Sequence, residues 1–273
     1  MSVIGGQNPI VQDGLVYILD FANQRTYLNA TFSGSFIQVD SPIENLIYSK
    51  TSSTLKTGSL VSALPVPSPL PELVGNFLEF RGVQGTKSGS YILADINPDG
   101  LYLPNANATV CFVASAKNTN SFLLALENGG TSTRQGISFG SNNVAYGARY
   151  QADVSRGFSG DFSEVNHVTF RLVSSSVECF VNGLPVSASN KTQASPDSNS
   201  GMRIGAESRS DQTAGLISGS LGTFYIYDRP LSADEIYDNY LQQARRYGLP
   251  EPPKPYTIDE NAYLYLQTAG ITG

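Results

Sequence analysis

Short apolar runs separated by turn-forming residues are the feature that most constrains this sequence. Most of the runs are five to seven residues long, and Gly, Asn, Ser or Pro lies between them. Runs of this length without a helical period are typical of strands. The pattern therefore predicts an all-β fold, a sandwich or a barrel. The clearest runs are 15–21, 77–81, 110–114, 122–126, 144–150, 168–173, 177–181 and 221–227.

Two of these runs predict a hairpin with one buried face. In 168–172 every second residue is Val, Phe or Leu, and in 177–181 every second residue is Val, Cys or Val. Ser174 to Ser176 supply the turn between them. The pair Asn182-Gly183 comes next, and this pair readily supplies the two positive φ angles of a type I′ turn. A third strand over 184–186 would complete a meander.

One segment near the C-terminus has a helical period. Ser232 is the expected N-cap, and Glu235 three residues later completes a capping box. Gly248 and Pro250 are expected to end the helix. The apolar stripe comprises Ile236, Tyr240, Leu241, Ala244 and Tyr247. We expect this stripe to pack on the β domain.

Three segments differ in composition from the rest. The Ser/Thr-rich stretch 41–75 runs into PVPSPLPE, and we expect a long surface loop there because proline cannot donate hydrogen bonds to a sheet. Residues 1–10 are expected to form an N-terminal arm. Residues 249–273 are expected to form a proline spacer and a C-terminal docking tail. The folded domain would then span 11–248.

Charge and ligand counts exclude several functions. The net charge of −6 and the pI near 4.8 argue against nucleic-acid binding, which depends on Lys and Arg. One His and two Cys cannot build a four-ligand structural zinc site. Cys111 and Cys179 lie in apolar runs, so buried free thiols are expected, with a mutual disulfide as the alternative. The sequence contains neither a signal peptide nor an 18-residue apolar span, so we expect folding in a cytoplasm.

Four motifs in this order resemble the concanavalin A-like, laminin-G-like jelly rolls found in structural proteins of tailed bacteriophages. They are DGLVYILDFANQRTY at 13–27, GNFLEFRG at 75–82, VNHVTFRLVSSSVECFVNGLPV at 165–186 and LGTFYIYDRPLSADEIYDNYLQQARRYG at 221–248. The last is similar to the closing strand, Tyr-Asp-Arg-Pro-Leu-Ser corner and short helix of that family. The tail DENAYLYLQTAGITG is similar to a segment found beside such domains in virion proteins. The resemblance implies a sandwich of two antiparallel sheets with one short C-terminal helix.

Some members of this fold are enzymes with a characteristic spacing of catalytic residues. Laminarinase-type members of the fold carry E-x-D-x-x-E, which supplies the two carboxylates of a retaining glycosidase. Asp161 and Glu164 are the nearest approach, and they lie in a Gly/Ser-rich loop. His167 stands where the family often has a histidine at the start of a hairpin strand, without a nucleophile motif beside it. We expect a structural histidine, no catalytic site and no cofactor.

Asp95, Asn97 and Asp99 match the first half of a calcium loop, D-x-N-x-D-G. The twelfth position of such a loop would be Ala106 and not the bidentate Glu. The simpler interpretation is a turn stabilised by Asx side chains and Gly100. Calcium binding stays open as the alternative.

Glycan binding would require Tyr side chains, because the chain has no Trp to stack on a sugar. Tyr146 and Tyr150, near Asn142 and Asn143, form the best candidate cluster. Tyr side chains on alternate faces of a strand also serve as cross-strand packing residues.

The resemblance implies a non-enzymatic virion structural protein, such as a capsid-decorating protein, a head fibre or a small tail component. Its expected partners are other capsid or tail subunits, with self-association as a further option, and the terminal arms would mediate attachment. The alternative is a glycan- or receptor-binding adhesin module of a phage tail or bacterial surface. Neither role requires nucleic acid or membrane insertion.

Overall fold

The expected runs of strand fold into two facing sheets. A computed structural model describes residues 10–48, 55–62, 69–83, 88–94, 107–118, 121–126, 135–139, 143–147, 156–173, 176–190, 202–209, 212–214 and 216–251. All the strand pairs within these ranges are antiparallel. The all-β prediction is confirmed.

The larger sheet has the strand order β16-β15-β14-β9-β20-β7-β6-β3-β2, and β1 pairs with the second half of β20. Its strands are β1 (Leu15–Asp20), β2 (Phe32–Ser33), β3 (Phe36–Ile37), β6 (Glu72–Val74), β7 (Phe77–Arg81), β9 (Asn107–Ala114), β14 (Asn166–Val173), β15 (Ser176–Val181), β16 (Leu184–Asn190) and β20 (Ser218–Tyr227). Long β20 is therefore the strand around which β9, β7 and β1 are arranged.

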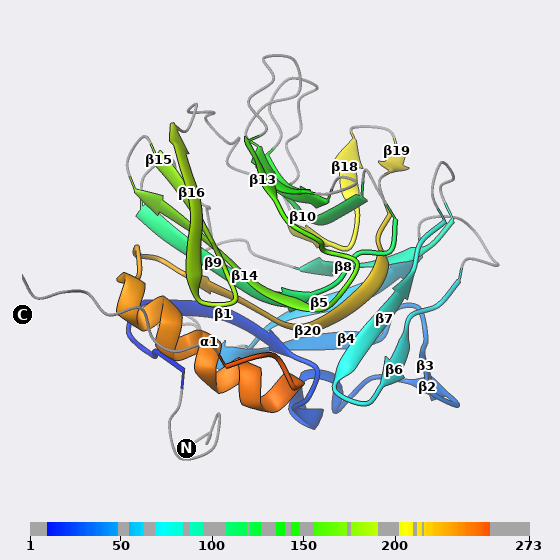
Figure 1. Cartoon of the computed structure of the whole chain (residues 1–273). Coiled ribbons are helices and arrows are strands. Elements are labelled where there is room, and N and C mark those ends of the chain that lie inside the picture. Colours follow the sequence, from blue (N-terminus) through cyan, green and yellow to red (C-terminus); the bar gives the residue numbers. More distant parts are fainter. Residues whose placement is uncertain are drawn as a thin grey trace, which may run out of the picture.

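The smaller sheet has the order β13-β12-β11-β10-β17-β8-β5-β4. Its strands are β4 (Pro42–Tyr48), β5 (Leu55–Ser62), β8 (Ser90–Ala94), β10 (Ser121–Leu126), β11 (Gln135–Phe139), β12 (Asn143–Gly147), β13 (Arg156–Ser159) and β17 (Met202–Ile204). A separate ribbon pairs β18 (Glu207–Arg209) with β19 (Gln212–Ala214), and η1 (Gln24–Tyr27) follows β1. Figure 1 shows the larger sheet curving beneath the smaller one.

The main core fills the space between the two sheets. Phe112 of β9 meets Phe139 of β11 edge to face, with ring centroids 6.2 Å apart. Phe170 lies beside Phe112 from the neighbouring strand β14. Because alternate residues of each strand point to the same face, apolar side chains from both sheets interdigitate here.

The predicted meander is confirmed. Asn182 and Gly183 have φ angles of 50° and 77°, as a type I′ turn requires, and they join β15 to β16. Cys111 and Cys179 are buried free thiols, so the interpretation as small apolar residues is also confirmed.

The expectation of a long surface loop over 41–75 is wrong. Strands β4 and β5 pair along one edge of the smaller sheet, and β6 joins the larger sheet. Ile43 and Leu60 are fully buried in the main core. A strand with one buried face needs few apolar residues, so the Ser/Thr-rich composition was misleading. Pro42 is tolerated because it begins an edge strand, where one side of the backbone lacks a partner strand.

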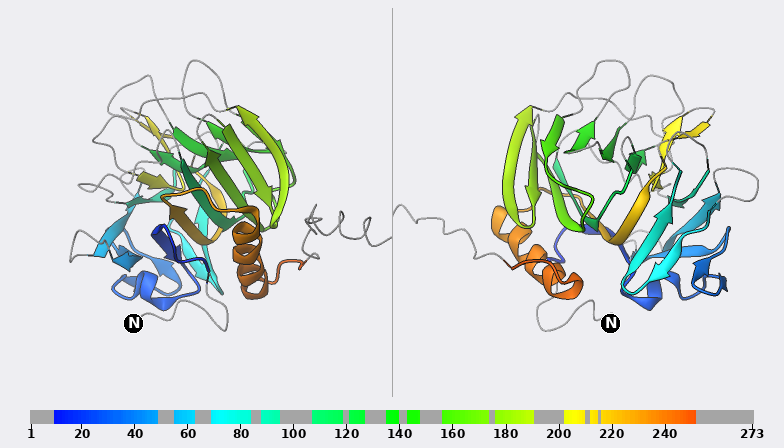
Figure 2. Two further views of the ribbon diagram at one scale, coloured as in Figure 1. Left: turned by 90° about the vertical axis from the view of Figure 1, so that its left-hand side faces the viewer. Right: turned by 45° about the vertical axis from the view of Figure 1, so that its right-hand side comes forward.

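The predicted helix is α1 (Ala233–Tyr247). Ser232 is its N-cap, both halves of the capping box with Glu235 are present, and Gly248 follows with a left-handed φ of 67°. Ile236 is fully buried against the outer face of the larger sheet, in a cluster that includes Tyr225 and Tyr227 of β20. Figure 2 shows α1 lying across this outer face, at the end of the molecule where the described chain begins.

Candidate functional site

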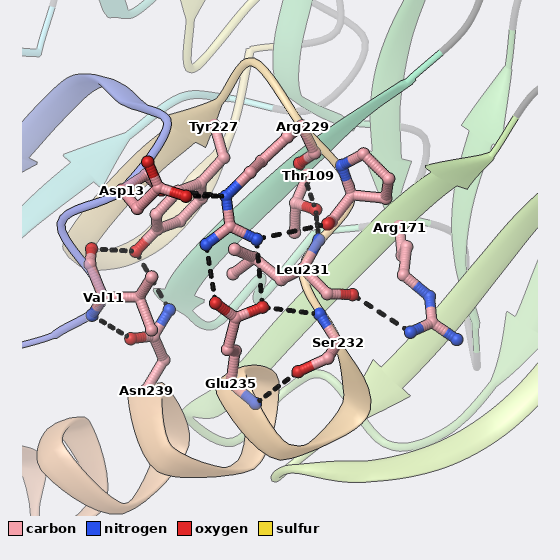
Figure 3. Close-up of polar contacts among 11 residues, drawn as sticks. Val11, Asp13, Thr109, Arg171, Tyr227, Arg229, Leu231, Ser232, Glu235 and Asn239 are labelled. Atoms are coloured by element: carbon pink, nitrogen blue, oxygen red, sulfur yellow. Dashed lines mark hydrogen bonds and ion pairs between the residues drawn. The ribbon is translucent and has the colours of Figure 1, made fainter.

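The corner between β20 and α1 is built around Arg229. Its guanidinium makes a double hydrogen bond to the Glu235 carboxylate, with N–O distances of 3.0 and 2.6 Å. Its Nε atom lies 2.9 Å from Oδ2 of Asp13, just before β1. Figure 3 shows Arg229 between the two carboxylates. One side chain therefore joins the entry to β1 with the first turn of α1.

Opposite charges at this corner stabilise one another. The double hydrogen bond from Arg229 lowers the pKa of Glu235 to about 2. The same contact raises the pKa of Arg229. Glu235 also lies in the first turn of a helix, where the helix dipole favours a negative charge. Both groups are therefore charged at neutral pH.

The segment that connects β20 to α1 is held by two neighbouring strands. The Thr109 hydroxyl donates to the carbonyl oxygen of Arg229 at 3.0 Å and accepts from the backbone N–H of Leu231 at 2.9 Å. Arg171 of β14 donates to the carbonyl oxygen of Leu231 at 3.0 Å. These bonds fix where α1 begins.

Asn239 binds the point where the chain enters the domain. Its Oδ1 accepts a hydrogen bond from the backbone N–H of Val11 at 2.8 Å, and its Nδ2 donates to the Tyr227 hydroxyl at 2.9 Å. The Tyr227 hydroxyl in turn donates to the carbonyl oxygen of Val11 at 3.1 Å. Asn239 is fully buried, and both backbone groups of the half-buried Val11 are paired.

Tyr240, the next residue of α1, binds the point where the chain leaves the helix. Its hydroxyl donates to the carbonyl oxygen of Pro250. Its ring lies against the β15–β16 turn, where a Cβ atom added to Gly183 would be 2.7 Å from Cδ1 of Tyr240. The missing side chain at Gly183 allows this approach.

The far end of α1 is held by an ion pair. Arg246 Nη1 lies 2.6 Å from Oδ2 of Asp20, whose carboxylate is nearly inaccessible at the end of β1. Burial raises the pKa of Asp20, and Arg246 opposes that rise. Removing one partner of such a pair would leave a buried charge, so the pair fixes α1 against β1.

These contacts define a terminal anchor, which consists of Val11, Tyr227, Asn239, Tyr240 and Pro250. Both ends of the described chain meet α1 there. Because Asn239 and Tyr240 are adjacent in the helix, the same helical turn holds Val11 and Pro250.

His167 lies beneath the terminal anchor. It is fully buried in β14, and its ring faces Tyr240 with centroids 5.6 Å apart. Neither ring nitrogen has a hydrogen-bond partner among the residues that the structure describes. Burial lowers the pKa of His167 to about 3. The imidazole is therefore a neutral packing group at pH 7, as a structural histidine would be.

The loop that contains Asp161 and Glu164 is organised around its own hydrogen bonds. Asp161 accepts from the backbone N–H of Ser163 at 3.0 Å and from its hydroxyl at 2.6 Å, and these bonds lower the pKa of Asp161. Asn166 donates to the carbonyl oxygens of Asp161 and Glu164. The carboxylate of Asp161 therefore closes a turn at the start of β14.

The remaining candidates fall largely outside the described residues. Asp95, Asn97, Asp99, Asn142 and Tyr150 lie there, as do arm residues 1–9 and tail residues 252–273. Asn143 and Tyr146 belong to β12. Within the described ranges, the structure brings together no group of three metal-binding side chains, and no helix is long and apolar enough to cross a membrane.

The sequence predicted the helix but not the anchor on it. Arg229 lies in the Tyr-Asp-Arg-Pro-Leu-Ser corner of the closing motif and Glu235 in its capping box, so that motif was the available signal for both residues. Asn239 and Tyr240 gave no such signal. Asn239 and Gln243 are the polar residues on the buried side of α1, and the sequence does not distinguish either of them from a solvent-facing residue.

Comparison with known proteins agrees with this architecture. Residues 96–237 match the family model described as the concanavalin A-like lectin/glucanases superfamily. The match spans just over half of the chain and ends within α1. The chain belongs to this superfamily. No curated protein sequence matches it.

Solved structures with a similar fold include sialidases. The Trypanosoma rangeli sialidase in complex with 2,3-difluorosialic acid superposes with a TM-score of 0.57 at 18% identity, covering 89% of this chain and 35% of that chain. The sialidase without a named ligand gives a TM-score of 0.56 at 18% identity, with coverages of 89% and 36%. The chain thus spans about a third of the length of these sialidases. At this identity the likeness concerns the fold alone.

Proposed function

We propose that this protein is a non-enzymatic structural component of a bacteriophage particle, attached to neighbouring capsid or tail subunits through its terminal segments. The terminal anchor carries the proposal, because it holds the entry and exit of the chain on one helix. We infer that the segments which continue from these two points, 1–9 and 252–273, dock on one neighbouring subunit. The order of the four phage-type motifs, which ends with the Arg229 corner, is the further support.

Mass spectrometry of purified particles from the source of this sequence tests the proposal. The expected result is a stoichiometric amount of the full chain in the particles. A version lacking 252–273 should be incorporated less well, while the intact chain supplied beside it should be incorporated normally. Absence of the intact chain from particles, or equal incorporation of both versions, would contradict the attachment role.

Absence of catalysis is part of the same proposal. The Asp161 carboxylate is engaged by Ser163, and His167 is buried without an accessible edge. A retaining glycosidase needs two carboxylates facing a substrate cleft. Full-length protein is therefore expected to release no sugar from β-glucans or from an aryl sialoside, and turnover of either substrate would disprove this part.

Glycan binding without catalysis is the second candidate. It is favoured by the superfamily, whose description includes lectins. Tyr146 on β12 is the residue that we would test first. A glycan array probed with the full chain, and with Tyr146→Ala as the comparison, would separate this role from a purely structural one. If the wild type binds a glycan and Tyr146→Ala does not, the result favours a glycan-binding module. If the wild type binds no glycan on the array, the result favours the structural role.

A further inference from the structure

The neutral imidazole of His167 lies directly behind the helix that holds both chain ends. Its backbone is fully paired with the adjacent turn: its N–H donates to Oδ1 of Asn182 at 3.0 Å, and its carbonyl oxygen accepts from the N–H of Asn182 at 2.8 Å. The backbone position of His167 is therefore fixed. Only the burial of its ring depends on the contact with α1.

We propose that His167 makes the terminal anchor acid-sensitive, so that protonation of this ring drives α1 off the sheet and frees Val11 and Pro250 together. The inference depends on the described contacts of α1 and not on the proposed function. It concerns a local movement of one helix within an otherwise folded domain.

The reason is the cost of a buried charge. An imidazolium at this position would be buried without a hydrogen-bond partner among the described residues, and burial of an unpaired charge is strongly unfavourable. Movement of α1 removes Tyr240 from the ring and admits water. The exposed ring then has its ordinary proton affinity, so acid stabilises the displaced helix.

The groups around the ring do not titrate in the relevant range. Tyr240 faces it from α1, and burial raises the pKa of that hydroxyl, which stays neutral in acid. Val113 is its partner on β9, and Asn182 lies beside it at the β15–β16 turn. Neither of these side chains ionises. Among these groups, His167 is therefore the one that responds as the pH falls below about 6.5.

Adjacency of Asn239 and Tyr240 makes the release concerted. Displacement of Tyr240 removes the donor to Pro250, and rotation of the same turn removes Asn239 from Val11. Glu235 contributes a separate acid response at the start of α1. That response begins only below about pH 4.5, the ordinary pKa of a free Glu carboxylate, and extends down to about pH 2 because the pKa of Glu235 is lowered in the folded protein.

Hydrogen–deuterium exchange of the full chain tests the proposal, with labelling times corrected for intrinsic exchange at each pH. Protection of residues 10–14 and 233–251 is expected to fall together, by up to about tenfold per pH unit between about 6 and 4.5. Peptides from β9 should keep their protection. His167→Phe, which keeps an aromatic ring and removes the titration, should abolish the fall in that range.

Three results would overturn the proposal: constant protection of the wild type, the same loss in His167→Phe, or loss from β9 in step with α1. If His167→Phe does not fold, the wild type supplies an independent test because His167 is the sole histidine of the chain. Its imidazole NMR signals should stay those of a neutral ring while α1 is protected. A titration near pH 6.5 with α1 still protected would disprove the mechanism.

Discussion

Asn239 and Tyr240, neighbours in α1, bind opposite ends of the described chain. The Asn239 carboxamide accepts from Val11 at 2.8 Å, and the Tyr240 hydroxyl donates to Pro250. A helix that closes a jelly roll thereby also holds Val11 and Pro250, which lie close to its two terminal segments. The stability of α1 and the fixation of these two residues are consequently linked.

Asn239→Ala is expected to lower the free energy of unfolding by about 1 to 3 kcal/mol, because it leaves the Val11 N–H without its acceptor and removes a donor to Tyr227. Urea unfolding followed by circular dichroism measures the change. Gln242→Ala, at a half-buried polar position of the same helix, is the control and should change stability by less than about 0.5 kcal/mol. Equal effects at the two positions would refute the anchoring role of Asn239.

Local signals account for the parts of this structure that the sequence predicted. The type I′ turn depends on Asn182 and Gly183 alone, and the start of α1 depends on Ser232 and Glu235 within one helical turn. Each is determined by interactions over a few residues, so a reader of the sequence can recognise it.

The sequence did not predict the terminal anchor. Val11 and Asn239 are 228 positions apart, and only the completed sheet brings them together. The strands within 41–75 were missed for a related reason. Ile43 and Leu60 become core residues through pairing with the smaller sheet, and the Ser/Thr-rich composition around them gives no sign of that pairing.

Glu235→Gln tests the charge at the corner. Gln can still complete a capping box, so the change removes chiefly the ion pair with Arg229. A loss of about 1 kcal/mol is expected at pH 7. Because the folded-state pKa is lowered, this contribution is present above about pH 4.5 and disappears as the pH falls through about 2. The stability difference between variant and wild type should therefore close in that range, and a pH-independent difference would contradict the assignment.

Gly183→Ala should destabilise the protein by about 1 to 3 kcal/mol, because the new Cβ would clash with the Tyr240 ring at a φ of 77°. Gly75→Ala is the control: it has a φ of 59°, but no atom lies within 4 Å of the added Cβ. The difference between the two melting temperatures isolates the clash from the backbone strain. Equal losses would mean that α1 does not approach the turn as described.

Ile236→Ala should cost about 2 to 5 kcal/mol, since Ile236 is fully buried between α1 and the larger sheet. Leu241→Ala, at a half-buried position of the same helix, should cost less. Thermal unfolding of both variants provides the comparison. A change within about 0.5 kcal/mol for Ile236→Ala would place that face of the helix in an interface with another molecule instead of the core.

Two truncations separate the anchor from the tail. Removal of 252–273 keeps Pro250 and the pairing of Arg245 with Glu251, so the free energy of unfolding should stay within about 0.5 kcal/mol of the full chain. Removal of 250–273 also deletes the acceptor of the Tyr240 hydroxyl and should cost about 1 kcal/mol more. Urea unfolding of the three proteins gives both differences.

A large loss on removing 252–273 alone would mean that the tail packs on its own domain. In that case the tail would not be free to dock on a neighbouring subunit, and the proposed attachment through it would fail.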